Sequence, residues 1–187
     1  MKKLFNIILI ALFLFPFSLA AREVGDVDVP EFLNQGGINL KLNGAGVQSK
    51  FFFDIYVSAL YLEHKSQDAE TILRSDKPMA IRLHIVSRMV DSDSLKEAIV
   101  DGFMQSTAGN MEPIRNQVDQ FLTLMNREIN KMDYIDFIYL PETGTRVLFN
   151  NTFLDDIKGL SFKRAFFGIW LGEDPVDEDL KAEMLGL

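Results

Sequence analysis

The chain has 187 residues, with 27 acidic against 19 basic side chains and a formal net charge of −8. An acidic surface repels nucleic acid and anionic lipid, so the composition argues against a nucleic-acid partner. No cysteine is present, which excludes disulfides and a lipoprotein anchor. The two histidines, His64 and His84, are too far apart to match a zinc spacing, and the sequence predicts neither a metal site nor a cofactor.

Residues 1–20 have the pattern of a secretory signal peptide. Lys2 and Lys3 precede an apolar run that ends in Ser18-Leu19-Ala20, with small residues at the two cleavage-site positions. The run is shorter than the ~20 residues of a membrane span, and Pro16 interrupts it. We therefore expect cleavage after Ala20, a periplasmic location, and no membrane span in the mature chain, which is residues 21–187 and has the length of one domain.

The stretch LNGAGVQSKFFFDIYVSALYLE, residues 42–63, places two glycines before an aromatic and β-branched run. A dinucleotide-binding loop needs a helix after its glycines and a third glycine, but position 49 is serine and the run alternates with the period of a strand. Nucleotide binding is therefore excluded. We expect one strand over residues 37–42, a tight turn at Gly44-Ala45-Gly46, and a second strand over residues 51–62.

The later elements alternate between the two periodicities. Helical spacing is expected at 66–73, from 92 with Ser94 and Glu97 as a capping box, and from Pro113 to Ile129. Strand patterns cover 79–86, 134–140, 146–149 and 152–157, and two helices follow at 161–171 and 175–185, the second with Asp174 as N-cap. The run EDPVDED is interpreted as helix-start chemistry rather than a calcium loop. This order predicts an α+β domain, an antiparallel sheet with helices on one face.

Two segments carry a resemblance to a known family. LNGAGVQSKFFFDIYVSALYLE resembles the strand pair of chalcone isomerase-like proteins, and IKGLSFKRAFFGIWLGEDPVDEDLKAEMLG resembles their C-terminal helix pair. The match extends over residues 37–186 and is closest to the bacterial secreted branch. The resemblance implies an open-faced β-sandwich with a helical layer over residues 21–187, and a ligand cleft between the large sheet and the helices.

The polar residues of the plant enzymes in this family are not retained. Those enzymes use an arginine after the glycines, a threonine on the next strand, a tyrosine and an asparagine around the first long helix, and a hydroxyl residue on the penultimate helix. These positions hold Gln48, Tyr56, Asp91 with Ala98, and Ile169. Removing one charge-stabilising donor typically costs about 10² to 10³ in rate, so the resemblance predicts no catalytic residue.

The preferred interpretation is a periplasmic, non-catalytic protein that binds a small apolar ligand, such as a fatty acid, or a protein partner, in a cleft lined by aromatic and aliphatic side chains. The alternative is an isomerase or intramolecular lyase with an unknown substrate, and a third is a structural factor of the cell envelope. The candidate ligand-binding residues are Gln48, Lys50, Tyr56, Arg82 and Arg88. In the alternative, Tyr56 is the donor, and Lys50, Arg82 or Arg88 supplies the positive charge. The sequence does not indicate an oligomeric state.

Trp170 belongs to an apolar stripe near the end of the chain. Helical spacing places it with Phe162, Phe166 and Ile169, so we expect it in the core, with Lys163 and Arg164 pointing away.

Overall fold

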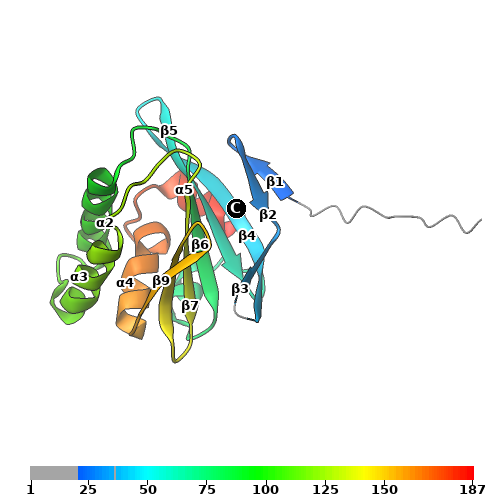
Figure 1. Ribbon diagram of the computed structural model, residues 1–187. Coiled ribbons are helices and arrows are strands. Elements are labelled where there is room, and N and C mark those ends of the chain that lie inside the picture. Colours follow the sequence, from blue (N-terminus) through cyan, green and yellow to red (C-terminus); the bar gives the residue numbers. More distant parts are fainter. Residues whose placement is uncertain (1–20, 36) are drawn as a thin grey trace, which may run out of the picture.

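Seven antiparallel strands form the main sheet of the computed structural model, which describes residues 21–35 and 37–187 (Figure 1). In spatial order the strands are β3 (Phe32–Gln35), β4 (Ile38–Lys50), β5 (Phe53–Leu62), β6 (Met79–Ile85), β7 (Tyr134–Leu140), β8 (Gly144–Phe149) and β9 (Thr152–Ile157). Each strand pairs with its neighbour in the chain, which confirms the predicted antiparallel sheet. The signal-peptide prediction falls on residues 1–20, outside the described residues.

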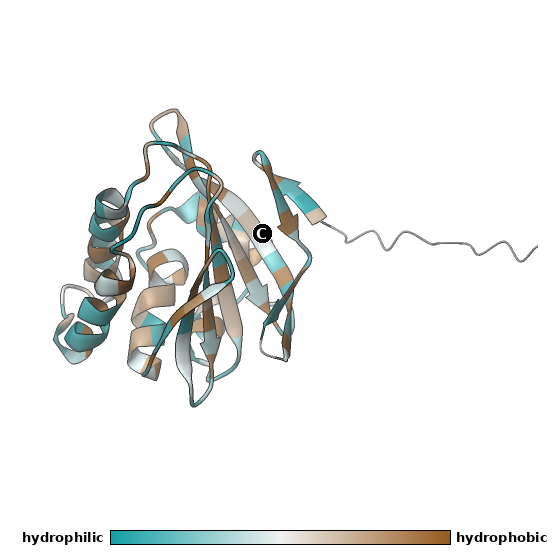
Figure 2. Cartoon of the chain, viewed as in Figure 1, coloured by the Kyte–Doolittle hydropathy of each residue, from teal (hydrophilic) through white to brown (hydrophobic). Residues whose placement is uncertain are grey.

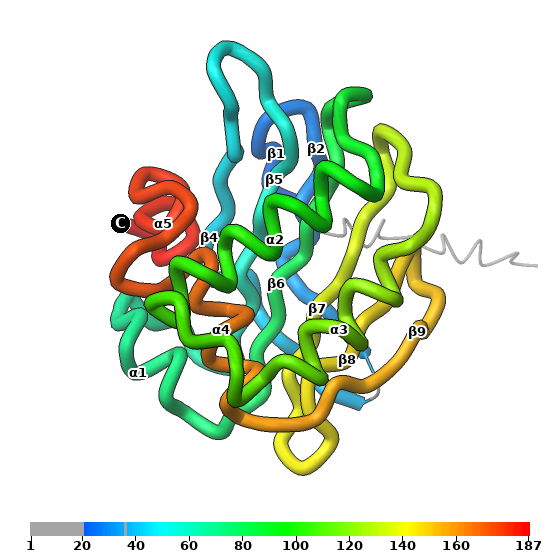
Figure 3. Tube along the Cα trace, turned by 90° about the vertical axis from the view of Figure 1, so that its left-hand side faces the viewer, coloured from blue at the N-terminus to red at the C-terminus, as the bar shows by residue number. Residues whose placement is uncertain are grey.

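Helices cover one face of this sheet and confirm the predicted α+β class. They are α1 (Ala69–Arg74), α2 (Ser92–Ser106), α3 (Arg115–Leu124), α4 (Leu160–Leu171) and α5 (Glu178–Leu185), with a single turn of 3₁₀ helix, η1, at Glu112–Ile114. Helix α4 lies against the sheet and α2 packs on α4 (Figure 3). Because strand side chains alternate, Leu60, Ile81 and Phe137 share the covered face and are essentially inaccessible. None of the helices in the described part of the chain is long and apolar enough to cross a membrane.

The opposite face of the sheet carries a second, smaller core. Strands β1 (Ala21–Val24) and β2 (Val27–Pro30) form a hairpin over it, and Val29 and Val57 are fully buried there. The Tyr61 hydroxyl donates a hydrogen bond of 2.9 Å to the Pro30 carbonyl and ties the hairpin to β5. The elements predicted from the sequence begin at residue 37, so this hairpin was not foreseen.

The predicted turn at Gly44-Ala45-Gly46 is wrong. Strand β4 runs straight through both glycines, and the chain reverses at Phe51 and Phe52 instead. Helix α5 explains the glycines, since a Cβ at Gly44 would lie 2.2 Å from the Glu183 carbonyl oxygen and one at Gly46 only 1.9 Å from the Glu183 carboxylate. The two glycines therefore let α5 lie directly on the strand.

Several helix ends differ from expectation, among them the start of α1 at Ala69 rather than residue 66. Helix α3 stops at Leu124 although its apolar pattern continues to the buried Ile129, which lies in an irregular segment. The capping box of α2 is formed by Asp91 with Ser94, not by Ser94 with Glu97. The N-cap of α5 is Asp177, whose carboxylate accepts from the Leu180 amide at 2.9 Å, so the helix begins three residues later than expected.

Candidate functional site

The space between the sheet and α4 is filled by aromatic rings. Phe166 lies 4.7 Å from Phe137 and 5.4 Å from Trp170 between ring centroids, and all three side chains are at most 1% exposed. Phe103 of α2 and Phe121 of α3 extend the cluster with centroid distances of 5.8 and 5.0 Å to Phe166. The expected aromatic lining of a cleft is therefore a packed core, and the prediction that Trp170 is a core residue is confirmed.

A small polar cluster lies at the edge of these rings, where β4 and β5 meet α4 and α5. Gln48 and Tyr56 are cross-strand partners, and the Trp170 indole Nε1 donates a 3.1 Å hydrogen bond to the Tyr56 hydroxyl. Gln48 Nε2 donates weakly, at 3.4 Å, to the carboxylate of Asp177, while its buried Oε1 accepts no hydrogen bond within the described residues. The cluster places two of the five candidate residues side by side.

Tyr56 is a neutral hydroxyl at this position. Burial, which is the largest cause, raises its pKa well above the usual value for tyrosine; the Trp170 hydrogen bond acts in the opposite sense, and the negative charge of Asp177 raises the pKa further. A phenolate is therefore disfavoured, and no basic side chain among the described residues hydrogen-bonds to the Tyr56 hydroxyl. This arrangement donates or accepts a hydrogen bond but does not stabilise a developing negative charge.

The other three candidates lie elsewhere. Lys50 is exposed at the tip of the β4–β5 hairpin, and Arg88 is exposed in the loop after β6. Arg82 points to the sheet face opposite the helices, where it forms a two-bond ion pair with the fully buried Asp136, with Nη2 to Oδ2 at 2.8 Å. Of the five predicted site residues, the structure brings together only Gln48 and Tyr56.

His84 shares the sheet face of Arg82, and this face is not the cleft. The imidazole is half-buried, with its ring centroid 5.6 Å from that of Tyr134, and its Nε2 has no hydrogen-bond partner within the described residues. Burial, together with the positive charge of Arg82, lowers the pKa of His84 to about 4. The side chain is therefore neutral at physiological pH. No group of three metal-ligating side chains occurs in residues 21–35 and 37–187.

Lys163 does not point away from the core, as its sequence position suggested. Its side chain is completely buried, and Nζ donates to the carbonyls of Ile72, Leu73 and Ser75 at 2.7, 2.8 and 3.0 Å. These carbonyls belong to the C-terminal end of α1, where the helix dipole favours a cation. Burial lowers the pKa of Lys163 to about 8, with Arg164 acting in the same sense. Lys163 joins α4 to α1.

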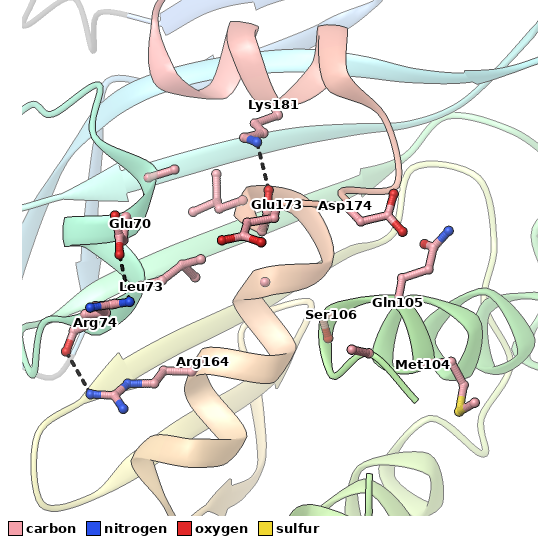
Figure 4. A pocket seen from close by; sticks show the side chains of 15 residues that line it. Glu70, Leu73, Arg74, Met104, Gln105, Ser106, Arg164, Glu173, Asp174 and Lys181 are labelled. Atoms are coloured by element: carbon pink, nitrogen blue, oxygen red, sulfur yellow. Dashed lines mark hydrogen bonds and ion pairs between the residues drawn. The ribbon is translucent and has the colours of Figure 1, made fainter. Parts of the chain in front are cut away.

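A groove of about 740 Å³ lies on the outer side of the helical layer, between α1, the end of α2, α4 and the start of α5 (Figure 4). We call it the helical groove. Leu73, Gly168 and Leu171 contribute its apolar lining. A Cβ at Gly168 would lie 3.3 Å from the Ser106 side chain, so the glycine permits the close approach of α2 that defines one wall.

Three cations border the helical groove, and they differ in what already binds them. Arg74 is paired with Glu70 at 2.7 Å, and Lys181 donates to the Gly172 carbonyl at 2.7 Å. Arg164 is exposed and has one hydrogen bond, a 3.2 Å contact from Nη2 to the Arg74 carbonyl, as Figure 4 shows. Its remaining guanidinium donors have no partner within the described residues, so Arg164 is the cation best placed to take a carboxylate.

The helical groove was missed at the sequence level. Lys163 and Arg164 were expected only to point away from the core. The signal that could have found the groove is the spacing of Arg164, Gly168 and Leu171, which places one cation, one small residue and one apolar residue on a single helical face.

The comparisons with known proteins agree with this fold. The family model described as chalcone isomerase-like matches residues 21–186, and the chain belongs to that family. Among solved structures, a fatty-acid binding protein of Arabidopsis thaliana is similar with a TM-score of 0.63 and 16% identity, covering 83% of this chain and 96% of that one. At this identity the likeness shows the fold alone. No curated protein matches.

Proposed function

We propose that this protein is a non-catalytic binding protein for a small amphiphile, a fatty acid or a molecule of similar chemistry, and that the helical groove is its binding site. The observation that carries the proposal is the position of Arg164, an exposed guanidinium beside the apolar lining of the groove. A groove of about 740 Å³ is in the size range of small-molecule sites. The similar Arabidopsis protein is a fatty-acid binding protein, which supports this ligand class.

The polar cluster supports the absence of catalysis. Ring closure by the plant enzymes of the family needs a fixed positive charge where this chain has Gln48, and the amide there faces the carboxylate of Asp177. The Tyr56 hydroxyl is already engaged by Trp170. Gln48 and Tyr56 are uncharged and lie next to the carboxylate of Asp177, which disfavours a developing anion there. The isomerase or lyase alternative is therefore the weaker proposal.

Titration of the mature chain with monomeric palmitate, followed by calorimetry, tests the proposal. Replacing Arg164 with Gln removes the charged hydrogen bonds to the ligand carboxylate and is expected to weaken binding by about tenfold or more. Arg115→Gln is the matched control, because Arg115 is also exposed but lies on α3 and pairs with Glu112. Equal affinity of the wild type and Arg164→Gln, or no binding at all, contradicts the proposal.

A third variant separates the two places where a ligand could bind. If Tyr56→Phe weakens palmitate binding and Arg164→Gln does not, the ligand occupies the interior between sheet and helices after displacing Trp170. Expected instead is unchanged affinity for Tyr56→Phe, since the Tyr56 hydroxyl lies inside the fold and bonds to Trp170.

Export to the periplasm is part of the proposal and rests on the pattern of residues 1–20. The family match begins at residue 21, directly after the expected cleavage position, which is consistent with a removable leader. Sequencing the N-terminus of protein taken from the cell envelope is expected to begin at Ala21. A sequence that begins at Met1 contradicts cleavage.

A further inference from the structure

The turn between β4 and β5 exposes three consecutive aromatic side chains. Phe51, Phe52 and Phe53 are 87, 97 and 59% exposed, the largest apolar exposure on neighbouring residues in the described chain. The hairpin projects beyond the rest of the sheet (Figures 1 and 3), and Figure 2 shows its tip in the hydrophobic colours. Exposed apolar clusters of this kind mark interaction sites, and these rings contribute nothing to either core.

Two further loops lie at the same end of the molecule. The amides of Val86 and Ser87 donate to the Ile55 carbonyl at 3.1 and 3.2 Å, and the amide of Met132 donates to the Ile85 carbonyl at 2.8 Å. These bonds bring residues 86–91 and 129–133 beside the base of the hairpin. Met89 is 57% exposed and Met132 66% exposed, so all three loops present apolar side chains. We call Lys50–Phe53 with Arg88, Met89, Lys131 and Met132 the hairpin end.

Each loop of the hairpin end also carries a cation. Lys50, Arg88 and Lys131 are exposed, and none of them hydrogen-bonds or pairs with an acidic side chain within residues 21–35 and 37–187. Long basic side chains next to apolar ones are suited to an interface, because the stem contacts the apolar phase while the charged group reaches a phosphate.

The acidic side chains in these loops are occupied within the protein. Asp54 accepts from Ser49 Oγ at 2.7 Å, and Asp91 caps α2 through the Ser94 amide at 2.8 Å. Asp133 accepts from the Asn130 amide and from Asn150 Nδ2, both at 2.7 Å. These donors are neutral and leave the three carboxylates charged, so the exposed aromatic side chains, more than the charge, distinguish the hairpin end from the rest of the surface.

We propose that the hairpin end docks on a lipid bilayer, with the three phenylalanines inserted at the level of the headgroups and acyl chains and the three cations against lipid phosphates. A stable protein interface needs shape complementarity as well as area, and a convex projecting tip offers this only to a partner with a matching hollow. A fluid bilayer closes around a convex tip and needs no matching surface. The acidic remainder of the molecule is repelled by an anionic leaflet, which orients the hairpin end toward it.

Sedimentation with phosphatidylcholine vesicles, with and without phosphatidylglycerol, tests this docking on the full mature chain. The wild type is expected to bind both, because the inserted aromatic side chains contact the acyl region of either bilayer. The Phe51→Ser, Phe52→Ser, Phe53→Ser triple variant is expected to lose at least about tenfold in partitioning, because three buried aromatic contacts are removed. These rings are exposed, so the variant should keep the wild-type melting temperature.

The matched control compares one exposed phenylalanine outside the hairpin end, Phe32, with one inside it, Phe52. Phe32 is 47% exposed on β3, where it pairs with Lys41 in the part of β4 remote from the hairpin. Phe32→Ser should bind vesicles like the wild type, and Phe52→Ser should bind less. Arg164→Gln should also bind normally, which separates docking from the proposed ligand groove. No vesicle binding by the wild type, equal binding by the triple variant, or dimerisation that the triple variant abolishes would each overturn the proposal.

Discussion

Replacing Trp170 with Ala is the most informative change to the interior. The side chain is 1% exposed and packs on Phe166 and Phe137, and a fully buried tryptophan replaced by alanine typically costs about 3 to 5 kcal/mol. The change also deletes the hydrogen bond to the Tyr56 hydroxyl, and leaving that group unsatisfied adds about 1 to 3 kcal/mol. We therefore expect a loss of about 5 kcal/mol in the free energy of unfolding, a large share of the stability of a domain.

Urea unfolding of the mature chain, followed by far-UV circular dichroism, measures this loss. Trp170→Phe separates the two contributions, because it keeps most of the apolar volume and removes the indole donor. Tyr56→Phe removes the same bond from the other side, and each of these two variants should cost about 1 to 2 kcal/mol. A double-mutant cycle then gives the coupling free energy of the hydrogen bond between Trp170 and Tyr56. If Trp170→Ala shifts the free energy of unfolding by less than about 1 kcal/mol, the tryptophan lies in an open cleft and the reasoning fails.

The remaining predictions concern four separate places. With Gln48 at the expected arginine position, chalcone absorbance should decay no faster than in buffer, and enzymatic decay would show that the active site was assigned wrongly. The unfolded chain binds more protons than the folded one between the ordinary pKa of histidine and about 4, because the pKa of His84 is lowered in the fold. The wild type should therefore lose about 2 to 3 kcal/mol of stability as pH falls through that window, whereas His84→Gln should not. Lys163 has the same sign in a higher window: its charged form is disfavoured in the fold, so the stability of the wild type relative to Lys163→Met should rise by about 2 kcal/mol between about pH 8 and pH 10, in paired denaturation curves. Gly44→Ala should destabilise by about 1 to 3 kcal/mol or more, since the new methyl meets the Glu183 carbonyl, and an unchanged urea midpoint would argue against close packing of α5.

Periodicity predicted the secondary structure of most of the chain because it reports which side chains are buried. The alternation in residues 51–62 predicted β5, whose bounds are Phe53–Leu62, and the apolar stripe of 161–171 predicted α4 within one residue. The close approach of a helix backbone to a strand backbone, by contrast, leaves no periodic pattern in the sequence. Gly44 and Gly46 were therefore assigned to a turn, although their role is to admit a helix that lies some 140 positions further along the chain.

The functional residues were harder to predict, because their roles depend on neighbours from other elements. Lys163 was placed on the solvent side of α4, and nothing in its own segment shows that α1 covers that side and offers three carbonyls. Arg82 and Tyr56 lie on adjacent strands but on opposite faces of the sheet, a relation fixed by the register. The resemblance gave Gln48 and Tyr56 as two separate positions, and the register of β4 and β5 is what shows them to be cross-strand partners.

The contact of α5 with β4 also determines when the fold can be completed. Asn43 Nδ2 donates to the Met184 carbonyl at 2.9 Å, a bond that joins residues 141 positions apart. Beside it, Gly44 and Gly46 have no side chains to cover the backbone of β4, so α5 covers it. A chain that is still being synthesised lacks this cover until residues 178–185 have left the ribosome. Strand β4 is made long before its cover, so it waits through the synthesis of every described element between them, since long-range contacts of this kind need both partners.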